Sequence, residues 1–544
     1  MEPNDQEQDR IRRAERIVRR SIVILLAVVL VGVTLLFVRN GKKIRQPDSP
    51  QPSIPRPTYG EELTQTLFYY PKNLVLGRPL PVQSFVSQTG STVSMRSFQG
   101  RYVVLMYFAS WCTHCDDQFR ALGDLDSFFA QYPDVTCFLV DKLDGQKETQ
   151  ETANAYLDKK GFQLECLYDQ GLTAYEAAGL QIVPTTIILD LQGDLAFCHP
   201  GALESQSQLA SMLSYVRNGP AADTESFITE SMMSPEGGVY SRYQDSSGLA
   251  TGHDVLSESQ GLLMEYAAEQ NDPYLFGFAY RYVQEQMMTY PLPVWVVENE
   301  QTITVNALLD DLRMLKALNL IQNRSGGYLD GLQGLAQNIA LYNFVNQQPV
   351  DFYDFLYKMP ASRFTLCYAD LDAMDTLSYH APIAESLPAA ARKLVSEGYI
   401  GDHFPLYRNY YDYTTGTYDT GSINMAEGLY TLYHLAEVDE LKQTSLDWLR
   451  EKMAGNGVFA RYNQDGQVTV GYEYESPAVY ALVGLIALEA DDPVLLTQAV
   501  SRMEQFRVFD TDSPANGGFG GEDIGQMASY DQLMALLLYA KMER

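Results

Sequence analysis

Tryptophan, cysteine and basic residues are all scarce in this sequence. Its 544 residues include 3 tryptophans and 6 cysteines, and 39 lysines and arginines stand against 69 aspartates and glutamates, which gives a formal net charge of −30. So negative a surface repels phosphate backbones, which argues against nucleic acid as a partner. Six cysteines in so long a chain are also too few for the disulfide framework of a small secreted protein.

Only two of the cysteines form a closely spaced pair, in Cys112-Thr113-His114-Cys115. A CxxC can be half of a zinc site, but no second cysteine or histidine pair follows it, so we expect no metal. The other four cysteines are predicted to be small buried hydrophobic residues. They are Cys137, Cys166, Cys198 and Cys367.

The sequence has one long uncharged hydrophobic run near its start, from Ser21 to Val38. The run is long enough to cross a bilayer as a helix, and charged residues bracket both of its ends. No small-residue cleavage site follows, which indicates an uncleaved signal anchor. Six arginines precede the run, so we expect the N-terminus to be cytoplasmic. The chain is thus predicted to be a single-pass protein of the cell membrane with its folded domains extracytoplasmic.

Five segments follow from this pattern. Five prolines between Gln46 and Pro57 predict an extended spacer. The predicted segments are a cytoplasmic tail (1–20), a transmembrane helix (21–38), a proline-rich linker (39–64), an α/β domain (65–220) and an all-α domain (221–544).

The first folded domain has strands and a helix around the CxxC. The apolar run 101–108 predicts a buried strand that leads into Trp111-Cys112, and helical spacing follows Cys115. Residues 136–141 and 181–190 predict two further strands. Pro184 opens the last of these strands, which makes it a candidate for a cis peptide bond.

Residues 75–217 resemble the thioredoxin fold, and more narrowly the exported TlpA/ResA-like thiol–disulfide proteins. The resemblance rests on the CxxC and on Val-Pro-Thr at the expected separation from it. The matching residues are Phe85, Phe98-Gln99-Gly100-Arg101, Phe108, Trp111-Cys112, Cys115, Asp169, Gly179, Val183-Pro184-Thr185, Asp190 and Gly193.

The chemistry of this domain follows from where its cysteines lie. Cys112 is expected at a helix N-terminus, where unpaired N–H groups and the helix dipole stabilise a thiolate, so it is the predicted nucleophile. Cys115 is predicted to resolve the mixed disulfide, so the redox-active disulfide Cys112–Cys115 takes the place of a cofactor. Pro184 is expected to lie against the pair. Three neighbours are predicted to contact the substrate: Trp111, His114 and Val183.

Two positions depart from the family that this domain resembles. The family usually has a proline inside the motif, where this chain has Thr113-His114, and a histidine beside the thiolate favours a more oxidising couple. The family also often keeps a buried polar group six residues before the first cysteine to move protons, and here that position is Met106. The direction of the redox reaction therefore stays open.

The C-terminal region changes to helical periodicity. Apolar residues recur at helical spacing in about eleven segments after residue 223. That number of helices fits an α/α toroid with an inner and an outer ring, and the long aromatic loops between the helices would form a cleft at one end. No short repeat supports a solenoid instead.

This region resembles glycoside hydrolase family 8, whose members have an (α/α)6 barrel, the six-hairpin glycosidase fold. The matching segments are 255–264, 306–312, 474–480 and 529–533. The resemblance implies that Glu258 is the general acid and that Asp311 lies at the sugar that is distorted. Two carboxylates facing across a cleft, one protonated and one ionised, suit an inverting hydrolase. We expect both side chains to reach the cleft.

The catalytic base is less well defined. The family's base precedes a helix in a Tyr-Asp segment, which implies Asp419, with Tyr418 beside it, but only after a two-residue shift, and the family's arginine is absent. The other candidates for the base are Asp412, Asp370 and Asp372. Without a base, the barrel would bind glycans and not cleave them.

The sequence therefore predicts a membrane-anchored thiol–disulfide oxidoreductase coupled to a barrel that acts on a surface polysaccharide. Its expected partners are exported proteins with thiols or disulfides, and a β-linked polysaccharide. One alternative makes the barrel a non-catalytic glycan- or protein-binding module that positions the redox domain. A second makes the CxxC a structural disulfide, against which its position at a helix start and Trp111 argue.

Overall fold

The structure is a computed structural model that describes residues 69–243, 254–297, 303–520 and 527–543. Within these ranges, no helix combines the length and the apolar character that a membrane crossing needs. The predicted tail, transmembrane helix and linker lie outside the described residues. The predicted boundary between the two folded domains, at residues 220 and 221, stays a prediction.

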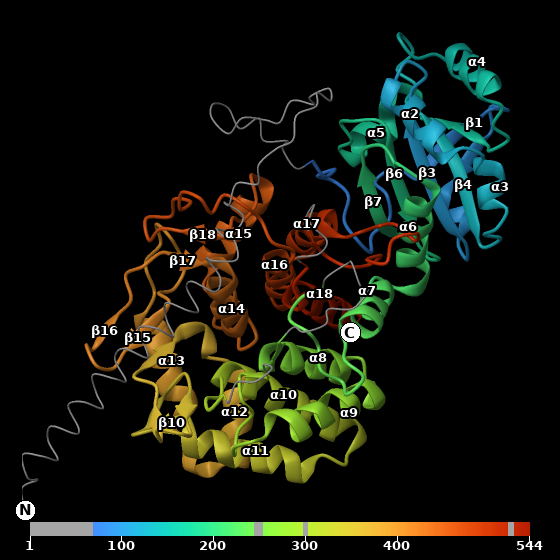
Figure 1. Cartoon of the computed structure of the whole chain (residues 1–544). Coiled ribbons are helices and arrows are strands. Elements are labelled where there is room, and N and C mark those ends of the chain that lie inside the picture. Colours follow the sequence, from blue (N-terminus) through green and yellow to red (C-terminus); the bar gives the residue numbers. More distant parts are fainter. Residues whose placement is uncertain (1–68, 244–253, 298–302, 521–526, 544) are drawn as a thin grey trace, which may run out of the picture. The chain divides into compact units, whose positions relative to one another are not determined.

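A seven-stranded sheet forms the centre of the first domain (Figure 1). The strand order is β2-β1-β5-β4-β3-β6-β7, and the central strand β3 runs parallel to β4 and antiparallel to β6. The strands are β1 (Ser84–Ser87), β2 (Thr92–Ser94), β3 (Tyr102–Phe108), β4 (Val135–Asp141), β5 (Cys166–Tyr168), β6 (Thr185–Leu189) and β7 (Leu195–Pro200). The three strands predicted from sequence are confirmed as β3, β4 and β6.

Helices cover both faces of this sheet. Successive side chains of a strand point to opposite faces, so Val104 and Met106 of β3 join one hydrophobic core while Val103 and Leu105 join another. The first core includes side chains of α2 and α6, and the second includes side chains of α5. The helices are α2 (Thr113–Leu122), α3 (Leu125–Phe129), α4 (Gln150–Lys160), α5 (Thr173–Ala178) and α6 (Gln206–Asn218).

The parallel pairing of β3 and β4 brings two loops together at one edge of the sheet. Phe108, the last residue of β3, is in register with Asp141, the last residue of β4. The backbone N–H of Lys142 donates to the carbonyl of Phe108 at 2.9 Å. The loop before α2, which ends at Cys112, therefore lies beside the loop between β4 and α4.

The second domain is a helical barrel whose inner helices close into a ring (Figure 1). Each inner helix contacts the next, and the last one, α18, packs against the first, α8. Side chains of α8, α16 and α18 are buried around nearly the whole helix, as expected of an inner position. The inner helices are α8 (Ser257–Glu269), α10 (Leu308–Ser325), α12 (Leu371–His380), α14 (Met425–Ala436), α16 (Pro477–Glu489) and α18 (Ser529–Met542).

The outer helices alternate with the inner ones along the chain. Helices α9, α11, α13 and α17 each pack on the inner helix that precedes them, and α7 and the π-helix η3 lie against α18. The outer elements are α7 (Ala222–Phe227), η3 (Ile228–Met232), α9 (Pro273–Tyr282), α11 (Leu329–Tyr342), α13 (Leu387–Glu397), α15 (Gln443–Ala454) and α17 (Pro493–Met503). Because inner and outer helices alternate in direction, the first turns of the inner helices meet at one end of the barrel.

Short strands gather in the loops that lead into these first turns. Strand β8 (Val255–Leu256) pairs with β9 (Val296–Val297) directly before α8, and β17 (Ile423–Asn424) pairs with β18 (Arg461–Tyr462) directly before α14. The remaining strands are β10 (Phe344–Val345), β11 (Gln348–Pro349), β12 (Tyr353–Asp354), β13 (Met359–Pro360), β14 (Arg363–Thr365), β15 (Tyr410–Asp412) and β16 (Thr417–Tyr418). They fix where the inner helices begin.

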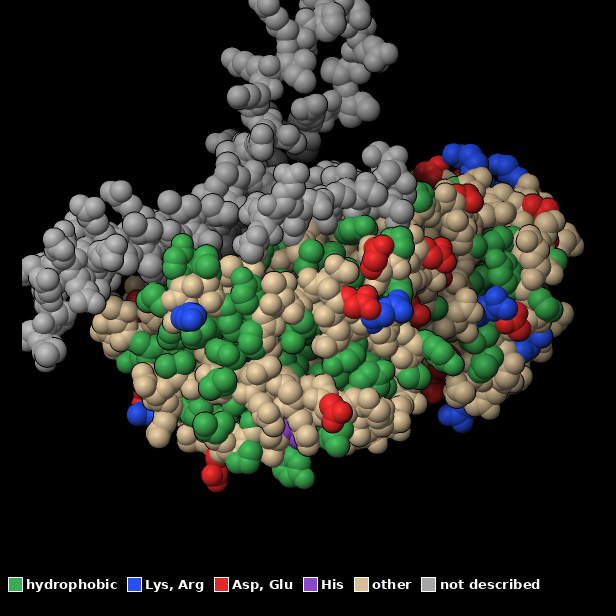
Figure 2. All heavy atoms as spheres, turned by 60° about the horizontal axis from the view of Figure 1, so that its bottom comes forward, with side chains coloured by type: hydrophobic (Ala, Val, Ile, Leu, Met, Phe, Trp, Pro, Cys, Tyr) green, Lys and Arg blue, Asp and Glu red, His purple; other side chains and the backbone are tan. Residues whose placement is uncertain are grey.

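One face of the molecule carries few charged side chains (Figure 2). Hydrophobic side chains are dispersed over it, and the acidic and basic side chains are scattered among them. The large excess of acidic residues in the sequence is therefore not concentrated on this face.

Candidate functional sites

The CxxC lies where strand β3 gives way to helix α2. Cys112 is the N-cap of α2, and its sulfur accepts a hydrogen bond from the backbone N–H of Cys115 at 3.2 Å. This is the position in which a helix N-terminus stabilises a thiolate. The sequence prediction that Cys112 starts the helix is confirmed.

The two sulfurs differ in their access to solvent. Cys112 is 6% exposed and Cys115 is fully buried, while the neighbouring Trp111 is 41% exposed. Burial, followed by a hydrogen bond with Cys112, raises the pKa of Cys115 well above its usual value. A substrate therefore meets Cys112 first, and Cys115 acts behind it.

The segment before β6 completes the edge around Cys112. The Val183–Pro184 peptide bond is cis, as predicted. The Cys112 sulfur lies 3.4 Å from the carbonyl oxygen of Val183 and donates to it. His114 is exposed on the first turn of α2, and Pro184 is buried. Val183 thus contacts Cys112, while Trp111 and His114 are exposed close to it in the chain, and the contact of all three with a substrate stays a prediction.

Sequence reasoning missed two buried carboxylates beside this motif. Met106 is apolar and fully buried, but two acids nearby are also fully buried: Asp141 at the end of β4 and Glu148 in the loop that follows. Burial, followed by repulsion from Glu148, raises the pKa of Asp141 to about 9. Their signal in the sequence was weak, because an acid at the end of a predicted strand and another in a loop are ordinary on a surface.

In the barrel, Glu258 lies in the first turn of α8 and is half-buried. Burial raises its pKa to about 7, the buried Arg313 opposes that rise, and Asp310 and Asp531 add to it. A carboxyl group with such a pKa carries its proton in about half of the molecules at neutral pH, whereas an ordinary glutamate is almost fully ionised there, and a general acid has to be protonated.

Asp310, and not Asp311, faces Glu258. Asp310 accepts hydrogen bonds from the hydroxyl of Ser257 and from Arg313, at 2.5 and 2.7 Å. Asp311 is fully buried and accepts a hydrogen bond from the side-chain amide of Asn306 at 2.6 Å. The sequence analysis expected Asp311 to reach the cleft, and its burial contradicts that expectation. Adjacent residues of a helix point in directions about 100° apart around its axis. The rotation of α10 about its own axis therefore decides whether Asp310 or Asp311 faces the barrel interior.

Asp419 lies just before β17 with its carboxylate already bonded. It accepts from the side-chain amide of Asn409 at 2.5 Å and from the backbone N–H of Gly421 at 3.1 Å. The hydroxyl of Tyr418 donates to the carbonyl of Leu394 at 2.7 Å. These bonds fix the loop, and they leave less of Asp419 available to activate water.

Two carboxylates that the sequence analysis did not select lie in the first turns of inner helices. Asp531, in α18, accepts from the hydroxyl of Ser476 and the backbone N–H of Ala478, and burial raises its pKa to about 6. Glu427, in α14, has its pKa raised by burial, while Arg461 opposes the rise. Asp531 lay within a segment matched to the hydrolase family, so a role for it could have been read from that match.

The other candidates for the base have structural roles. Asp412 accepts from the backbone N–H of Thr414 within its own turn. Asp370 is the buried N-cap of α12. Asp372 lies in the first turn of the same helix, and its carboxylate is 3.5 Å from Lys316 Nζ. Among the described residues, no hydrogen bond or ion pair joins any of the three to Glu258.

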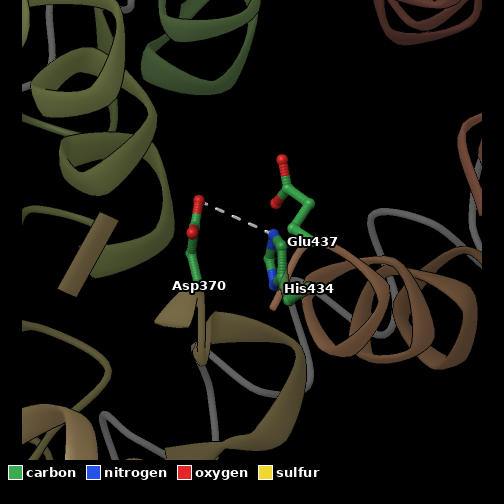
Figure 3. Close-up of side chains that lie close together, drawn as sticks. All are labelled: Asp370, His434 and Glu437. Carbon is green, nitrogen blue, oxygen red and sulfur yellow. Dashed lines mark ion pairs between the residues drawn. The ribbon is translucent and has the colours of Figure 1, made fainter. Parts of the chain in front are cut away.

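Asp370, His434 and Glu437 form the group that could offer ligand atoms to a metal ion (Figure 3). His434 Nε2 lies 3.8 Å from Asp370. However, Lys316 Nζ is 2.6 Å from Glu437, and Lys541 Nζ is 3.3 Å from the same oxygen. Two ammonium groups already supply the positive charge there, so the cluster fits a buried ion-pair network better than a metal site.

Comparison with known proteins separates the two domains clearly. A model of the AhpC/TSA family matches residues 76–197. Residues 76–197 form an AhpC/TSA-family thioredoxin-like domain. The thiol–disulfide oxidoreductase ResA of Halalkalibacterium halodurans is 22% identical over 117 residues, which cover 22% of this chain and 64% of ResA. The AhpC/TSA-family domain is therefore similar to a thiol–disulfide oxidoreductase, and it carries the CxxC at the start of a helix.

Two further similar proteins cover more of the chain than the AhpC/TSA-family domain alone. YdaJ of Bacillus subtilis, described as a candidate lipoprotein, is 29% identical over 355 residues, which cover 64% of this chain and 93% of YdaJ. The solved structure of an alpha-amylase from Clostridium perfringens is 30% identical, covers 59% of this chain and 97% of its own, and has a TM-score of 0.55. The chain thus joins the AhpC/TSA-family domain to a helical barrel of the glycoside-hydrolase type.

Proposed function

We propose that this chain is a membrane-anchored protein whose redox domain and barrel both work outside the cytoplasm. The uncharged run 21–38 and the arginines before it support the anchor and its orientation. The relative YdaJ is described as a candidate lipoprotein, which is also a membrane-attached class. Protease added to intact cells should remove both folded domains, and protection of the CxxC domain in sealed cells would reverse the orientation.

For the redox domain, the proposed substrates are exported proteins with thiols or disulfides. The observation that carries this proposal is Cys112 at the start of α2, with its sulfur near the surface and Cys115 buried behind it. The Cys112 thiolate attacks one sulfur of a substrate disulfide, so the substrate S–S bond breaks, its other sulfur leaves as a thiolate, and a mixed disulfide with Cys112 forms. The Cys115 thiolate then attacks the Cys112 sulfur, which releases the substrate thiol and leaves the Cys112–Cys115 disulfide.

The test is to trap the mixed disulfide in cells. With Cys115→Ser, partners should accumulate in disulfide linkage to Cys112, because nothing resolves the intermediate. With Cys112→Ser they should not accumulate. Equal trapping by both variants would refute the assignment of Cys112 as the nucleophile.

For the barrel, we propose glycan hydrolysis with Glu258 as the general acid. The carrying observation is that Glu258 is half-buried in a first turn, with a pKa near 7 and other carboxylates around it. The similarity to an alpha-amylase supports a glucan as the substrate class. The family-8 resemblance favoured β-linked glycans, so the substrate panel has to hold both linkages.

The base is proposed to be Asp419 or its neighbour Glu427, which act on each other electrostatically near β17. Purified full-length protein in detergent would be tested on starch and on β-glucans. Glu258→Gln should abolish cleavage and retain binding, since the amide keeps the shape without a proton to donate. Glu285→Gln, at an exposed glutamate of the same domain, is the matched control.

The same assay decides the alternative of a non-catalytic module. The hydrogen bonds that occupy Asp419 favour this alternative, because a base has to accept a proton from water. Binding of a glycan without any product would establish the binding module. Neither binding nor cleavage of any glycan in the panel would leave only the fold in common.

A further inference from the structure

Glu148 holds the residue that leads into the CxxC. Its carboxylate accepts two hydrogen bonds from Ser110, from the backbone N–H at 3.0 Å and from the hydroxyl at 2.9 Å. Glu148 is fully buried, although it comes from the loop between β4 and α4 and lies 38 positions further along the chain. A buried carboxylate that accepts two hydrogen bonds from one residue fixes that residue in both position and orientation.

A second contact joins the same two loops. The ammonium of Lys147 lies 3.6 Å from the centre of the Trp111 ring. Within the loop, Asp144 accepts from the backbone N–H groups of Gln146 and Glu148, at 2.8 and 2.9 Å. Lys147 and Glu148 of the loop after β4 thus contact the two residues directly before Cys112.

Asp141 lies behind Glu148 in the core. It is fully buried, and neither of its carboxylate oxygens has a hydrogen-bond partner among the described residues. An ionised carboxylate in that state would be costly, and a second one beside it more so. A proton on Asp141 removes this cost and gives the pair a donor.

We propose that Glu148 is a positioning residue for the redox motif, acting through Ser110, and that the buried Asp141 carries the proton that keeps the Glu148 carboxylate in place. The Ser110 backbone sets the course of the chain into Trp111 and Cys112, and so the point at which α2 begins. Among the described residues, no hydrogen bond joins the Glu148 side chain to either cysteine. Its effect on the reaction therefore passes through the geometry of the Cys112 turn.

The proton on Asp141 makes the arrangement sensitive to alkaline pH. The groups that act on Asp141 are three carboxylates from two neighbouring segments, together with residues of β5. They are Glu148 and Asp144 of the loop, Asp169 after β5, and Cys166 and Tyr168 of β5. Loss of the proton would place two buried negative charges side by side and loosen the hold on Ser110.

The first test separates a positioning role from a structural one. In the full-length protein, Glu148→Gln should lower kcat for insulin reduction about tenfold, with KM nearly unchanged, which corresponds to about 1.4 kcal/mol in the barrier. Glu165→Gln, at an exposed glutamate just before β5, removes the same charge and should leave kcat unchanged. Rates would be measured well below the unfolding temperature, so that lost stability does not enter.

A double variant shows whether Ser110 transmits the effect. Ser110→Ala removes the hydroxyl bond, so the combination with Glu148→Gln should lose no more activity than Glu148→Gln alone. If the two losses multiply, Glu148 does not act through Ser110 and the proposal fails. An unchanged kcat in Glu148→Gln would also refute it.

The second test follows the Asp141 proton. Trp111 is one of three tryptophans, so Trp295→Phe and Trp448→Phe make it the sole reporter beside Ser110. In the oxidised protein, where the CxxC has no thiolate, Trp111 fluorescence should change with a midpoint near pH 9. Asp141→Asn should remove that transition, and Asp158→Asn, at an exposed position, should keep it. A transition that persists in Asp141→Asn would come from another group and would overturn the role given to Asp141.

Discussion

Replacing Asp141 with asparagine should make the redox domain more stable, and increasingly so as the pH rises. In the folded chain Asp141 keeps its proton up to a pKa of about 9, whereas the ordinary value is 3.8. Between those values the folded state binds one more proton than the unfolded state, so stability from this group is fully present below pH 4 and is lost as the pH rises towards 9. Asparagine has no proton to hold and escapes this loss.

The size of the effect follows from the linkage. Each pH unit between the two pKa values is worth about 1.4 kcal/mol. The compared quantity is the free energy of unfolding of Asp141→Asn minus that of the unchanged protein. Between pH 5 and pH 8 this difference should increase by about 4 kcal/mol, as an upper limit.

Urea unfolding at pH 5, 6, 7 and 8 would measure this difference. Trp111 fluorescence, in the background with Trp111 as the sole tryptophan, reports on the redox domain and not on the barrel. Asp158→Asn is the control and should show no dependence of the difference on pH. A difference for Asp141→Asn that stays flat within about 0.5 kcal/mol would mean that Asp141 is ionised in the folded protein, and the reasoning on burial would be wrong.

Three further predictions concern the remaining sites. Iodoacetamide at pH 7 should label Cys112 long before Cys115, because Cys115 is fully buried with a raised pKa, and equal labelling would contradict this order. If the barrel cleaves a glycan, kcat should fall as the pH rises past about 7, since Glu258 then loses its proton; a rate that stays constant to pH 9 would exclude Glu258 as the acid. Lys316→Met should destabilise the barrel by about 3–5 kcal/mol in calorimetry, because it leaves Glu437 without its nearest cation, and a loss below about 1 kcal/mol would show that Lys541 suffices.

The redox motif could be predicted from the sequence because its signals are local. A strand, a CxxC and a helix follow one another in residues 102–122, and Pro184 opens a strand that has an unmistakable apolar run. Each of these features depends on a few consecutive residues. The cis bond before Pro184 and the helix start at Cys112 were both foreseen for that reason.

The carboxylates around the motif could not be predicted in the same way. Ser110 and Glu148 meet only because β3 and β4 end at the same edge of the sheet, and one sequence does not show which loop residue turns inward. In the barrel, Asp310 and Asp311 are consecutive acids, and a shift of one residue in helical phase exchanges the one that faces Glu258 for the one that bonds Asn306. Side-chain direction there depends on where α10 begins, which the preceding loops decide.

The contact between α18 and α8, which closes the ring of inner helices, also affects how the barrel folds during its synthesis. Ribosomes deliver α8 first, and its last neighbour emerges some 260 residues later, so the ring stays open for nearly the whole synthesis of the domain. Pairs of adjacent helices can form early, but each exposes an apolar flank until the next pair arrives. During that interval the growing chain offers the kind of surface that holdase chaperones bind, while the redox domain ahead of it has already finished folding.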